Sequence, residues 1–176
     1  MNLESILHQL VDEKKFRKLR GILEEMNEVD IAEFIQEIEQ EKVVLVFRLL
    51  PKELGAEVFA CLEIDMQEYI INSMSDYELQ KIIEELYIDD AVDMLEEMPA
   101  TIVRRVMENT KPETRKLINQ FLNYPENSAG SIMTAEFIDL KKTMTVDDAI
   151  DRIRSIGLQT ETINTCYVIG VHRKLL

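Results

Sequence analysis

Glycine and proline are scarce in this sequence, with five and four of them among 176 residues. Hydrophobic residues make up 46% of the chain. So much apolar material with so few residues that interrupt regular structure predicts an ordered core built from long uninterrupted elements. The length suits one full domain and part of a second, because domains commonly contain about 100–200 residues.

Cysteines and long apolar runs are also rare. Cys61 and Cys166 lie in unlike contexts, and we expect both to be free thiols in a reducing compartment. The longest plain apolar run, Val43–Phe47, is far shorter than the roughly 20 residues that span a bilayer. Glu4 and Asp12 interrupt the apolar residues of the N-terminus, so no signal peptide is expected. These absences predict a soluble fragment that is not secreted and does not itself cross a membrane.

Basic residues are outnumbered by acidic ones. The chain has 20 Lys and Arg against 34 Asp and Glu, which gives a formal charge of −14. Such a chain repels nucleic acid and anionic lipid and attracts cations, so no nucleic-acid partner is expected. Acidity that only keeps the protein soluble explains the composition more simply. Charge alone therefore identifies no ligand.

From Leu3 to Leu122 the apolar residues recur at spacings of three and four, which predicts one amphipathic helix after another. Helix starts are expected near capping residues and prolines, namely Asp65, Ser75, Asp89 or Asp90, Pro51, Pro99 and Pro112. Each helix has about ten residues and is marginal on its own in water, so it must bury a face against its neighbours.

The sequence also matches itself at a shift of 48 positions. Pro51 falls on Pro99, and apolar residues coincide around them, including Phe34 on Ile82, Ile35 on Ile83, Phe47 on Leu95 and Val58 on Val106. A fixed period of this size is typical of stacked helical repeats, although one amphipathic pattern can also match another by chance. We predict a mainly α fold, a right-handed superhelix of short stacked helices of the α-solenoid type.

The two copies differ in their acidic residues. Where the first copy has Glu41, Lys42 and Leu45, the second has Asp89, Asp90 and Asp93. Local structure explains part of this difference, because Asp89 or Asp90 can cap a helix and Asp90 with Asp93 resembles a capping box. Asp93, however, replaces a leucine, so the repeat architecture does not require an acid at that position.

A bound cation is the other explanation for these acids. Asp89 and Asp93 are four residues apart on one helix face, where two carboxylates repel each other unless a cation lies between them. Mg²⁺ suits such a sparse site, since it is often held by one or two carboxylates together with water. Zn²⁺ fits less well, because the histidines and cysteines (His8, His172, Cys61 and Cys166) form no ligand-spaced cluster. The sequence also lacks an EF-hand loop and any catalytic signature, so we do not expect an enzyme.

After Leu122 the helical pattern ends in a turn-rich stretch, which predicts a domain boundary between residues 123 and 124. A strand is expected over Glu136–Leu140, a helix from Val146 to about Ile156, and a strand over Thr165–Ile169. Capping residues at the two helix ends are Thr145 with Asp148, and Gly157. This β-α-β fragment is too small to bury a core alone, so it should lean on the helical domain or on another copy, or be poorly ordered.

Residues 124–134, Y-P-E-N-S-A-G-S-I-M-T, and residues 145–150, T-V-D-D-A-I, resemble a junction found in MgtE-type magnesium transporters. In that family the junction joins the N-terminal helical domain to the first CBS motif. Residues 89–99, D-D-A-V-D-M-L-E-E-M-P, resemble the family's helical-domain motif as well. The resemblance spans nearly the whole chain. It implies an N-terminal helical-repeat domain over residues 1–123, and a linker with a truncated, incomplete first CBS motif over residues 124–176.

The resemblance also implies a function and a site. Members of this family are homodimeric channels in the bacterial cell membrane, and their cytoplasmic helical and CBS domains bind Mg²⁺ through interfacial acids. Carried over by motif, the ligands would be Glu57, Asp89 and Asp93, with a backbone carbonyl of Gly130 added. The chain would thus be a regulatory Mg²⁺ sensor in which the ion bridges the two domains and favours the closed state. Its partners, the second CBS motif, the connecting helix and the transmembrane domain, would lie outside this chain.

One alternative for a site residue and two alternative functions remain open at this point. Without the resemblance, Glu57 is an ordinary solvated helix residue. The chain could be a helical-repeat scaffold that binds a protein partner without sensing metal, like the similar helical domains of flagellar motor switch proteins. It could also belong to a nucleotide sensor, because pairs of CBS motifs bind adenine nucleotides, although the incomplete motif argues against a nucleotide here.

Overall fold

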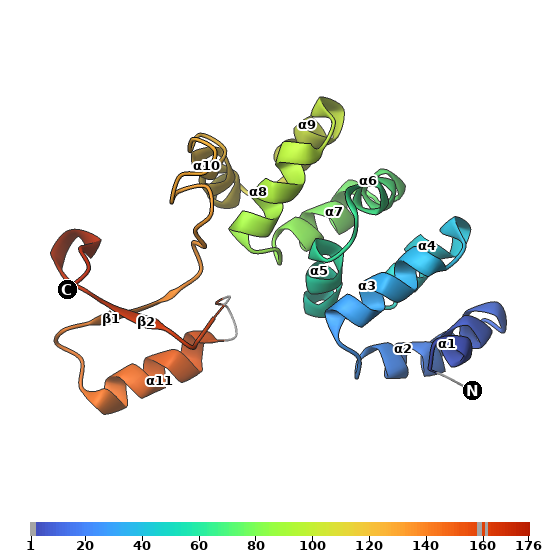
Figure 1. The fold of residues 1–176 in the computed structure, drawn as a ribbon, viewed down its shortest axis with the longest axis horizontal. Helices are drawn as coiled ribbons and strands as arrows, with labels where there is room; N and C mark the ends of the chain where they lie inside the picture. Colours follow the sequence, from blue (N-terminus) through green and yellow to red (C-terminus); the bar gives the residue numbers. More distant parts are fainter. Residues whose placement is uncertain (1–2, 158–159, 161) are drawn as a thin grey trace.

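The computed structural model describes residues 3–157, 160 and 162–176. It is a curved stack of helices followed by a small unit of two strands and one helix, with the chain termini at opposite ends (Figure 1). The helices of the stack are α1 (Leu3–Asp12), α2 (Phe16–Leu23), α3 (Glu28–Glu37), α4 (Gln40–Phe47), α5 (Lys52–Ala60), α6 (Ile64–Ser73), α7 (Asp76–Ile83), α8 (Ile88–Glu97), α9 (Ala100–Asn109) and α10 (Pro112–Phe121). The predicted mainly α architecture is confirmed.

The helices begin at strictly regular intervals. From α2 onward they start at residues 16, 28, 40, 52, 64, 76, 88, 100 and 112, so each start follows the last by 12 residues. The odd-numbered helices α3, α5, α7 and α9 pack on one another in sequence, while α4 packs on α6 and α8 on α10. The smallest structural repeat is therefore a pair of helices, one from each layer. The shift of 48 positions in the sequence spans two such pairs.

One continuous apolar core runs through the stack, from Leu7 in α1 to Phe121 in α10. The sequence shift matches positions that are buried in both copies. Examples are Ile35 with Ile83 and Val58 with Val106. Each short helix thus covers the apolar face of the next, and this burial stabilises elements that would be marginal alone. No helix in the part of the chain that the structure describes is both long and apolar enough to cross a bilayer.

The helix starts differ in part from the prediction. Ser75 caps α7, as predicted, and it also forms a capping box with Glu78. Pro112 is the first residue of α10, and Pro51 and Pro99 are the N-cap residues of α5 and α9. The predicted starts at Asp65 and at Asp89 or Asp90 were wrong, because α6 and α8 begin one or two residues earlier, after the N-cap residues Glu63 and Tyr87.

The reason for the early start of α8 is burial of its first residue. Ile88 is only 4% exposed, so the chain turns into the helix early enough to place this side chain in the core. Asp89 and Asp90 then fall in the first turn, where their charges interact favourably with the helix dipole without capping it.

The C-terminal unit consists of β1 (Ile138–Lys141), α11 (Val146–Ile156), β2 (Cys166–Ile169) and a short 3₁₀ helix, η2 (Val171–Arg173). The strands are parallel, with Ile138 opposite Cys166, so the predicted strand–helix–strand order is confirmed. The capping box of Thr145 and Asp148 at the start of α11 is also confirmed. Gly157 is the C-cap residue, but with φ of −59° it does not adopt the left-handed conformation that favours glycine there.

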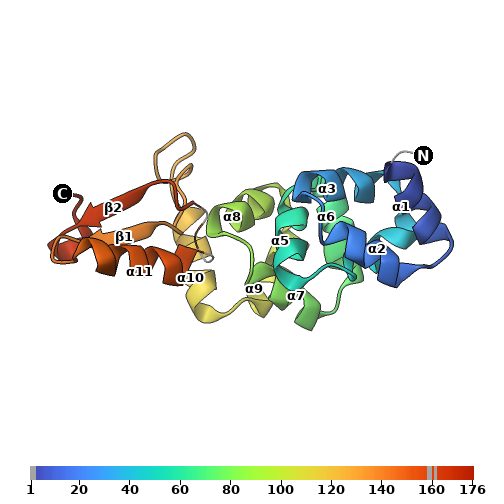
Figure 2. The same ribbon diagram turned by 90° about the horizontal axis from the view of Figure 1, so that it is seen from below.

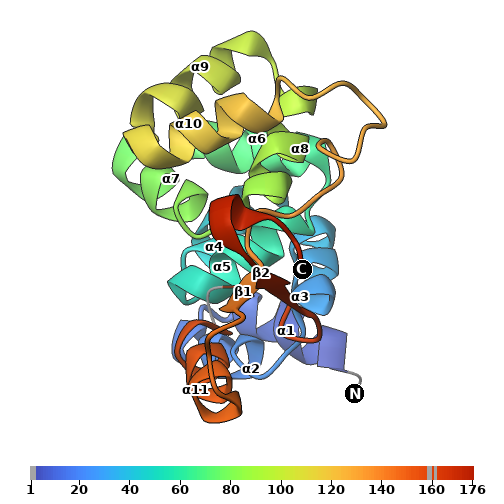
Figure 3. The same ribbon diagram turned by 90° about the vertical axis from the view of Figure 1, so that its left-hand side faces the viewer.

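This unit has almost no core of its own. Among its described residues, Ile138 is the one apolar side chain that is buried, and α11 buries none. The unit instead leans on the start of α8: the Tyr87 hydroxyl donates to the Thr160 carbonyl at 3.4 Å, and the Ile88 N–H donates to Glu136 Oε1 at 3.3 Å. Figure 2 shows the unit at one end of the stack, and Figure 3 views it from that end with the helices behind.

Candidate metal site

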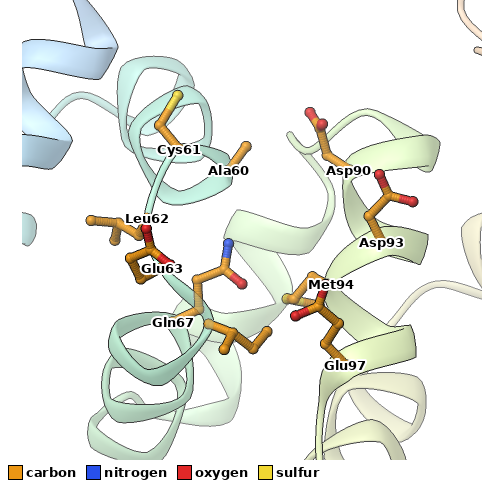
Figure 4. A pocket seen from close by; sticks show the side chains of 10 residues that line it. Ala60, Cys61, Leu62, Glu63, Gln67, Asp90, Asp93, Met94 and Glu97 are labelled. Carbon is orange, nitrogen blue, oxygen red and sulfur yellow. The ribbon is translucent and has the colours of Figure 1, made fainter.

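An open acidic pocket lies where the end of α5 and the start of α6 face α8 (Figure 4). Its volume is about 290 Å³, and the carboxylates on its walls are Glu63, Asp90, Asp93 and Glu97. Figure 4 shows the three acids of α8 following one another along one wall, with Cys61 and Glu63 on the other. We call this cavity the acidic pocket.

The chemistry of the acidic pocket suits a hard divalent cation. Among the described residues that line it, none is Lys or Arg. Gln67 and the carboxylates supply oxygen atoms, and the opening leaves room for water. Mg²⁺ prefers oxygen ligands and keeps several of its own waters, so the donor set fits it. The pocket brings Asp93, predicted from the sequence, together with three acids that the sequence did not identify as ligands.

Glu57 lies beside the acidic pocket, on an exposed face of α5. Burial and the charges of Glu28 and Glu53 raise its carboxyl pKa. Cys61 lines the pocket and lies close enough to Glu57 to feel its charge. Burial and the charges of Glu28, Asp90 and Glu57 raise the pKa of its thiol. A band of negative charge thus runs from the start of α3 past the end of α5 to the start of α8.

The next repeat carries a basic residue at the position that corresponds to Glu57. At a shift of 48 positions, Glu57 corresponds to Arg105, and Glu28 corresponds to Asp76. Arg105 Nη2 forms an ion pair with Asp76 at 2.9 Å. In the earlier repeat the corresponding residues, Glu57 and Glu28, are both carboxylates. Neither of these two side chains supplies the positive charge that Arg105 gives to the later ion pair. A bound cation would restore it.

Asp89 points to the junction between the two units. It is half-buried and its Oδ1 atom is buried, and it is not among the residues that line the acidic pocket. Burial raises the pKa of Glu136, and the negative charge of Asp89 raises it further. The structure therefore places Asp89 next to an acid of the C-terminal unit, whereas Asp93 faces the pocket.

Gly130 lies in the turn-rich segment after α10, which contributes none of the described residues that line the acidic pocket. A Cβ atom on Gly130 would come within 2.5 Å of the Tyr124 ring, which in turn packs edge-on against Phe121 at 5.8 Å. Glycine at this position is thus explained by the close approach of the backbone to an aromatic ring. A carbonyl ligand at Gly130 stays a prediction.

Comparison with protein families adds a decisive observation. Residues 26–127 match the model of the MgtE intracellular N domain, so more than half of the chain is covered. The chain belongs to the MgtE N-domain family. The matched range includes α3 to α10 and both walls of the acidic pocket.

Curated relatives of this MgtE-family chain are longer than it is. It is 32% identical over 173 residues to the magnesium transporter MgtE of Thermus thermophilus, covering 96% of this chain and 38% of the relative. It is 24% identical over 167 residues to the magnesium transporter MgtE of Bacillus subtilis, covering 95% of this chain and 37% of the relative. The chain thus spans under two fifths of the length of these two transporters.

Solved structures extend the likeness over both units of the MgtE-family chain. The cytosolic domain of the Mg²⁺ channel MgtE, crystallised in complex with ATP, matches with a TM-score of 0.85 and 31% identity over 98% of this chain and 71% of that one. The soluble part of a magnesium transporter matches with a TM-score of 0.89 over 98% of this chain and 68% of that one, and at 22% identity it supports the fold alone.

Sequence reasoning missed most of the acidic pocket. It treated Asp90 as a cap and did not single out Glu63 or Glu97. Glu63 is the N-cap residue of α6, and Asp90 and Glu97 of α8 follow it by 27 and 34 residues, so no local spacing reveals their proximity. The 12-residue interval between helix starts was the available signal, because it brings the starts of alternate helices to one edge of the stack.

Proposed function

We propose that this chain is the Mg²⁺-sensing, cytoplasmic regulatory part of a magnesium transporter or channel. Mg²⁺ binds the band of acids formed by Glu57, Asp90 and Asp93 and the neighbouring junction acid Asp89. The ion is a regulatory ligand here, and the chain performs no catalysis.

The observation that carries this proposal is the acidic pocket itself. Carboxylates from α8 and from the N-cap residue of α6 face one opening whose described lining contains no basic residue. The family membership and the two magnesium-transporter relatives support the choice of Mg²⁺ over other oxygen-seeking cations. Both observations concern the same stretch of chain.

The mechanism follows from electrostatics. Without Mg²⁺, acids of the helical stack and of the adjoining CBS unit repel one another, as the pair Asp89 and Glu136 illustrates. With Mg²⁺, the ion bridges such acids and favours the closed arrangement. Each site contributes a free energy of RT ln(1 + [L]/Kd) in favour of the closed arrangement. Shifting an equilibrium from 1:99 to 99:1 requires about 5.5 kcal/mol, which several weak sites reach together.

The rest of the assembly belongs to the same proposal. Residues 1–123 form the helical domain and residues 124–176 the linker with the first part of a CBS motif. In the longer protein this region lies on the cytoplasmic face of the bacterial cell membrane. The second CBS motif, a connecting helix, the transmembrane domain and a second copy of the chain are its partners.

A Mg²⁺ titration of the purified chain tests the proposal, with calorimetry and melting temperature as the two measurements. We expect heat of binding and a rise in melting temperature. NaCl at matched ionic strength controls for screening, which also stabilises a chain with a formal charge of −14. The variant Asp90→Asn plus Asp93→Asn should lose the response.

The matched control is Glu108→Gln plus Glu113→Gln, which removes the same charge from exposed positions on α9 and α10. It should respond to Mg²⁺ like the wild type. An equal response from both double variants would show that Mg²⁺ acts through net charge and not through the pocket. No Mg²⁺ response in the wild type would favour the protein-binding scaffold, and a response to ATP alone would favour the nucleotide sensor.

A further inference from the structure

A second group of metal-ligating side chains lies at the N-terminal end of the stack. Glu4 and His8 of α1 meet Glu37, the last residue of α3, and one ligand atom from each lies within 4.8 Å of the other two. A single ion with bonds of about 2.0–2.2 Å holds neighbouring ligand atoms about 3–4 Å apart, so side-chain rotation suffices to close the group around it. Sequence spacing does not reveal this group, because Glu37 lies two helices beyond His8.

The geometry places the imidazole for coordination. Glu4 and His8 are four residues apart and share a face of α1. The His8 ring packs edge-on against Phe34 of α3, with centroids 5.4 Å apart and an interplanar angle of 79°. This contact holds the ring between the two helices. The two carboxylates are exposed and the imidazole is half-buried, so an ion can reach the group from solvent.

The repeat supplies an independent reason to expect a cation here. At a shift of 48 positions, Glu4 corresponds to Lys52 and Glu37 to Glu85. Lys52 of α5 and Glu85, which lies just after the end of α7, form an ion pair. In the first repeat a carboxylate stands where Lys52 stands, so the α1–α3 contact has two acids in place of a pair of opposite charges.

The surroundings add to the negative charge. Glu37 ends α3, whose last turn contains no basic residue, and a carboxylate at a helix C-terminus is unfavourable. Asp30 and Glu33 line the adjoining pocket of about 220 Å³ together with Glu4 and Glu37. A positive ion between α1 and α3 relieves both effects.

We propose that Glu4, His8 and Glu37 bind a divalent transition-metal ion of the zinc and cobalt class, with water completing its coordination, and that the ion joins α1 to α3. One imidazole with two carboxylates suits these ions, whereas Mg²⁺ prefers oxygen ligands alone. The site shares no residue with the acidic pocket. It therefore gives the chain a second metal selectivity that is independent of the Mg²⁺ proposal.

Titration of the purified chain with Co²⁺, followed by visible absorption, tests this site, and Zn²⁺ calorimetry gives the affinity. We expect one ion per chain. His8→Gln and Glu37→Gln should each weaken Zn²⁺ binding by more than about tenfold, since loss of even an outer-shell partner costs about that much. His172→Gln removes the only other histidine, and Asp93→Asn removes an acid of the acidic pocket, so both should bind Zn²⁺ like the wild type.

Three results would overturn the proposal: no Co²⁺ spectrum and no Zn²⁺ heat in the wild type, undiminished binding in His8→Gln, or an equal loss in His172→Gln. Melting curves without metal establish that each variant is folded, and Glu37→Gln decides the question if His8→Gln is unstable. Mg²⁺ titration of His8→Gln separates the two proposals, because its Mg²⁺ response should equal that of the wild type whatever the Zn²⁺ result.

Discussion

Glu78 makes several side-chain contacts within the helical stack. Its carboxylate accepts from the Ser75 N–H at 2.9 Å and the Ser75 hydroxyl at 2.8 Å, and from Arg48 Nε at 2.8 Å. Arg48 and then Ser75 lower the pKa of Glu78 to about 2. One side chain thus caps α7 and holds it to the end of α4.

The lowered pKa of Glu78 predicts a dependence of stability on pH. The pKa of Glu78 is about 2 in the folded state, against an ordinary pKa of 4.5. Ionised Glu78 therefore stabilises the folded state at pH above 4.5, and this contribution fades as the pH falls toward 2. Glu78→Gln should lower the free energy of unfolding at neutral pH and make it less sensitive to acid. Urea unfolding at a series of pH values measures both effects.

Glu96→Gln is the control for Glu78→Gln, because it removes an acid from the exposed side of α8. Its pH profile should run parallel to that of the wild type. A Glu78→Gln profile that also ran parallel would contradict a stabilising role for the ionised carboxylate.

At this scale the sequence shows local partners and hides distant ones. The pairing of Ser75 with Glu78 was predictable because a capping box has a fixed spacing of three residues. Arg48 was not predictable, because it lies 30 residues from Glu78 in the sequence and only the tertiary fold brings the end of α4 to this residue. Asp93 was found because it replaces a leucine of the earlier copy. Glu63 was missed although Lys15 and Lys111 stand at the corresponding positions of the other repeats.

The second helix of the stack is held by packing more than by its own ends. In α2 the N-cap residue Lys15 makes no side-chain capping bond, and the interior contains Gly21. Leu19 and Leu23 are fully buried, so tertiary contacts compensate for poor local propensity. An added Cβ on Gly21 would meet no atom within 4 Å.

Gly21→Ala should therefore stabilise the protein. Alanine loses less backbone entropy than glycine in a helix interior, which is worth about 0.5–1 kcal/mol. For a chain of this size the melting temperature should rise by roughly 1–4 °C. Gly130→Ala is the contrasting variant, since its Cβ would collide with the Tyr124 ring, and it should lower the melting temperature. A fall with Gly21→Ala would show that α2 needs glycine for a reason other than space.

Periodicity predicted that these elements are helices, and burial decided where they begin. Isolated acids such as Asp65 and Asp89 look like caps in the sequence. The structure starts both helices earlier because the preceding isoleucines, Ile64 and Ile88, pack toward the core. Tertiary packing outweighs the contribution of a cap here, which is about 1 kcal/mol.

At the scale of the whole molecule, the junction between the two units combines attraction and repulsion. The Ile88 N–H and the Tyr87 hydroxyl donate to the C-terminal unit, while Asp89 and Glu136 bring two negative charges together. Such a junction is sensitive to any cation or substitution that neutralises one of the acids.

Glu136→Gln should therefore tighten the junction in the absence of Mg²⁺. The amide still accepts from the Ile88 N–H but no longer repels Asp89. Slower proteolysis of the segment around residues 123–137 should report this, and adding Mg²⁺ should then protect the variant less than the wild type. Glu126→Gln, at an exposed position of the same segment, should leave both results unchanged. Faster proteolysis of Glu136→Gln would show that the ionised carboxylate holds the units together.

The 12-residue interval between helix starts has a consequence for how such a stack changes in length. Insertion or loss of one helix between α6 and α8 would put these two helices in opposite layers, and Glu63 and the acids of α8 would then leave their shared edge. A change of 24 residues, which is one helix from each layer, keeps every side chain on its own face. Evolution can therefore lengthen or shorten the helical stack that carries the C-terminal unit only by whole pairs of helices.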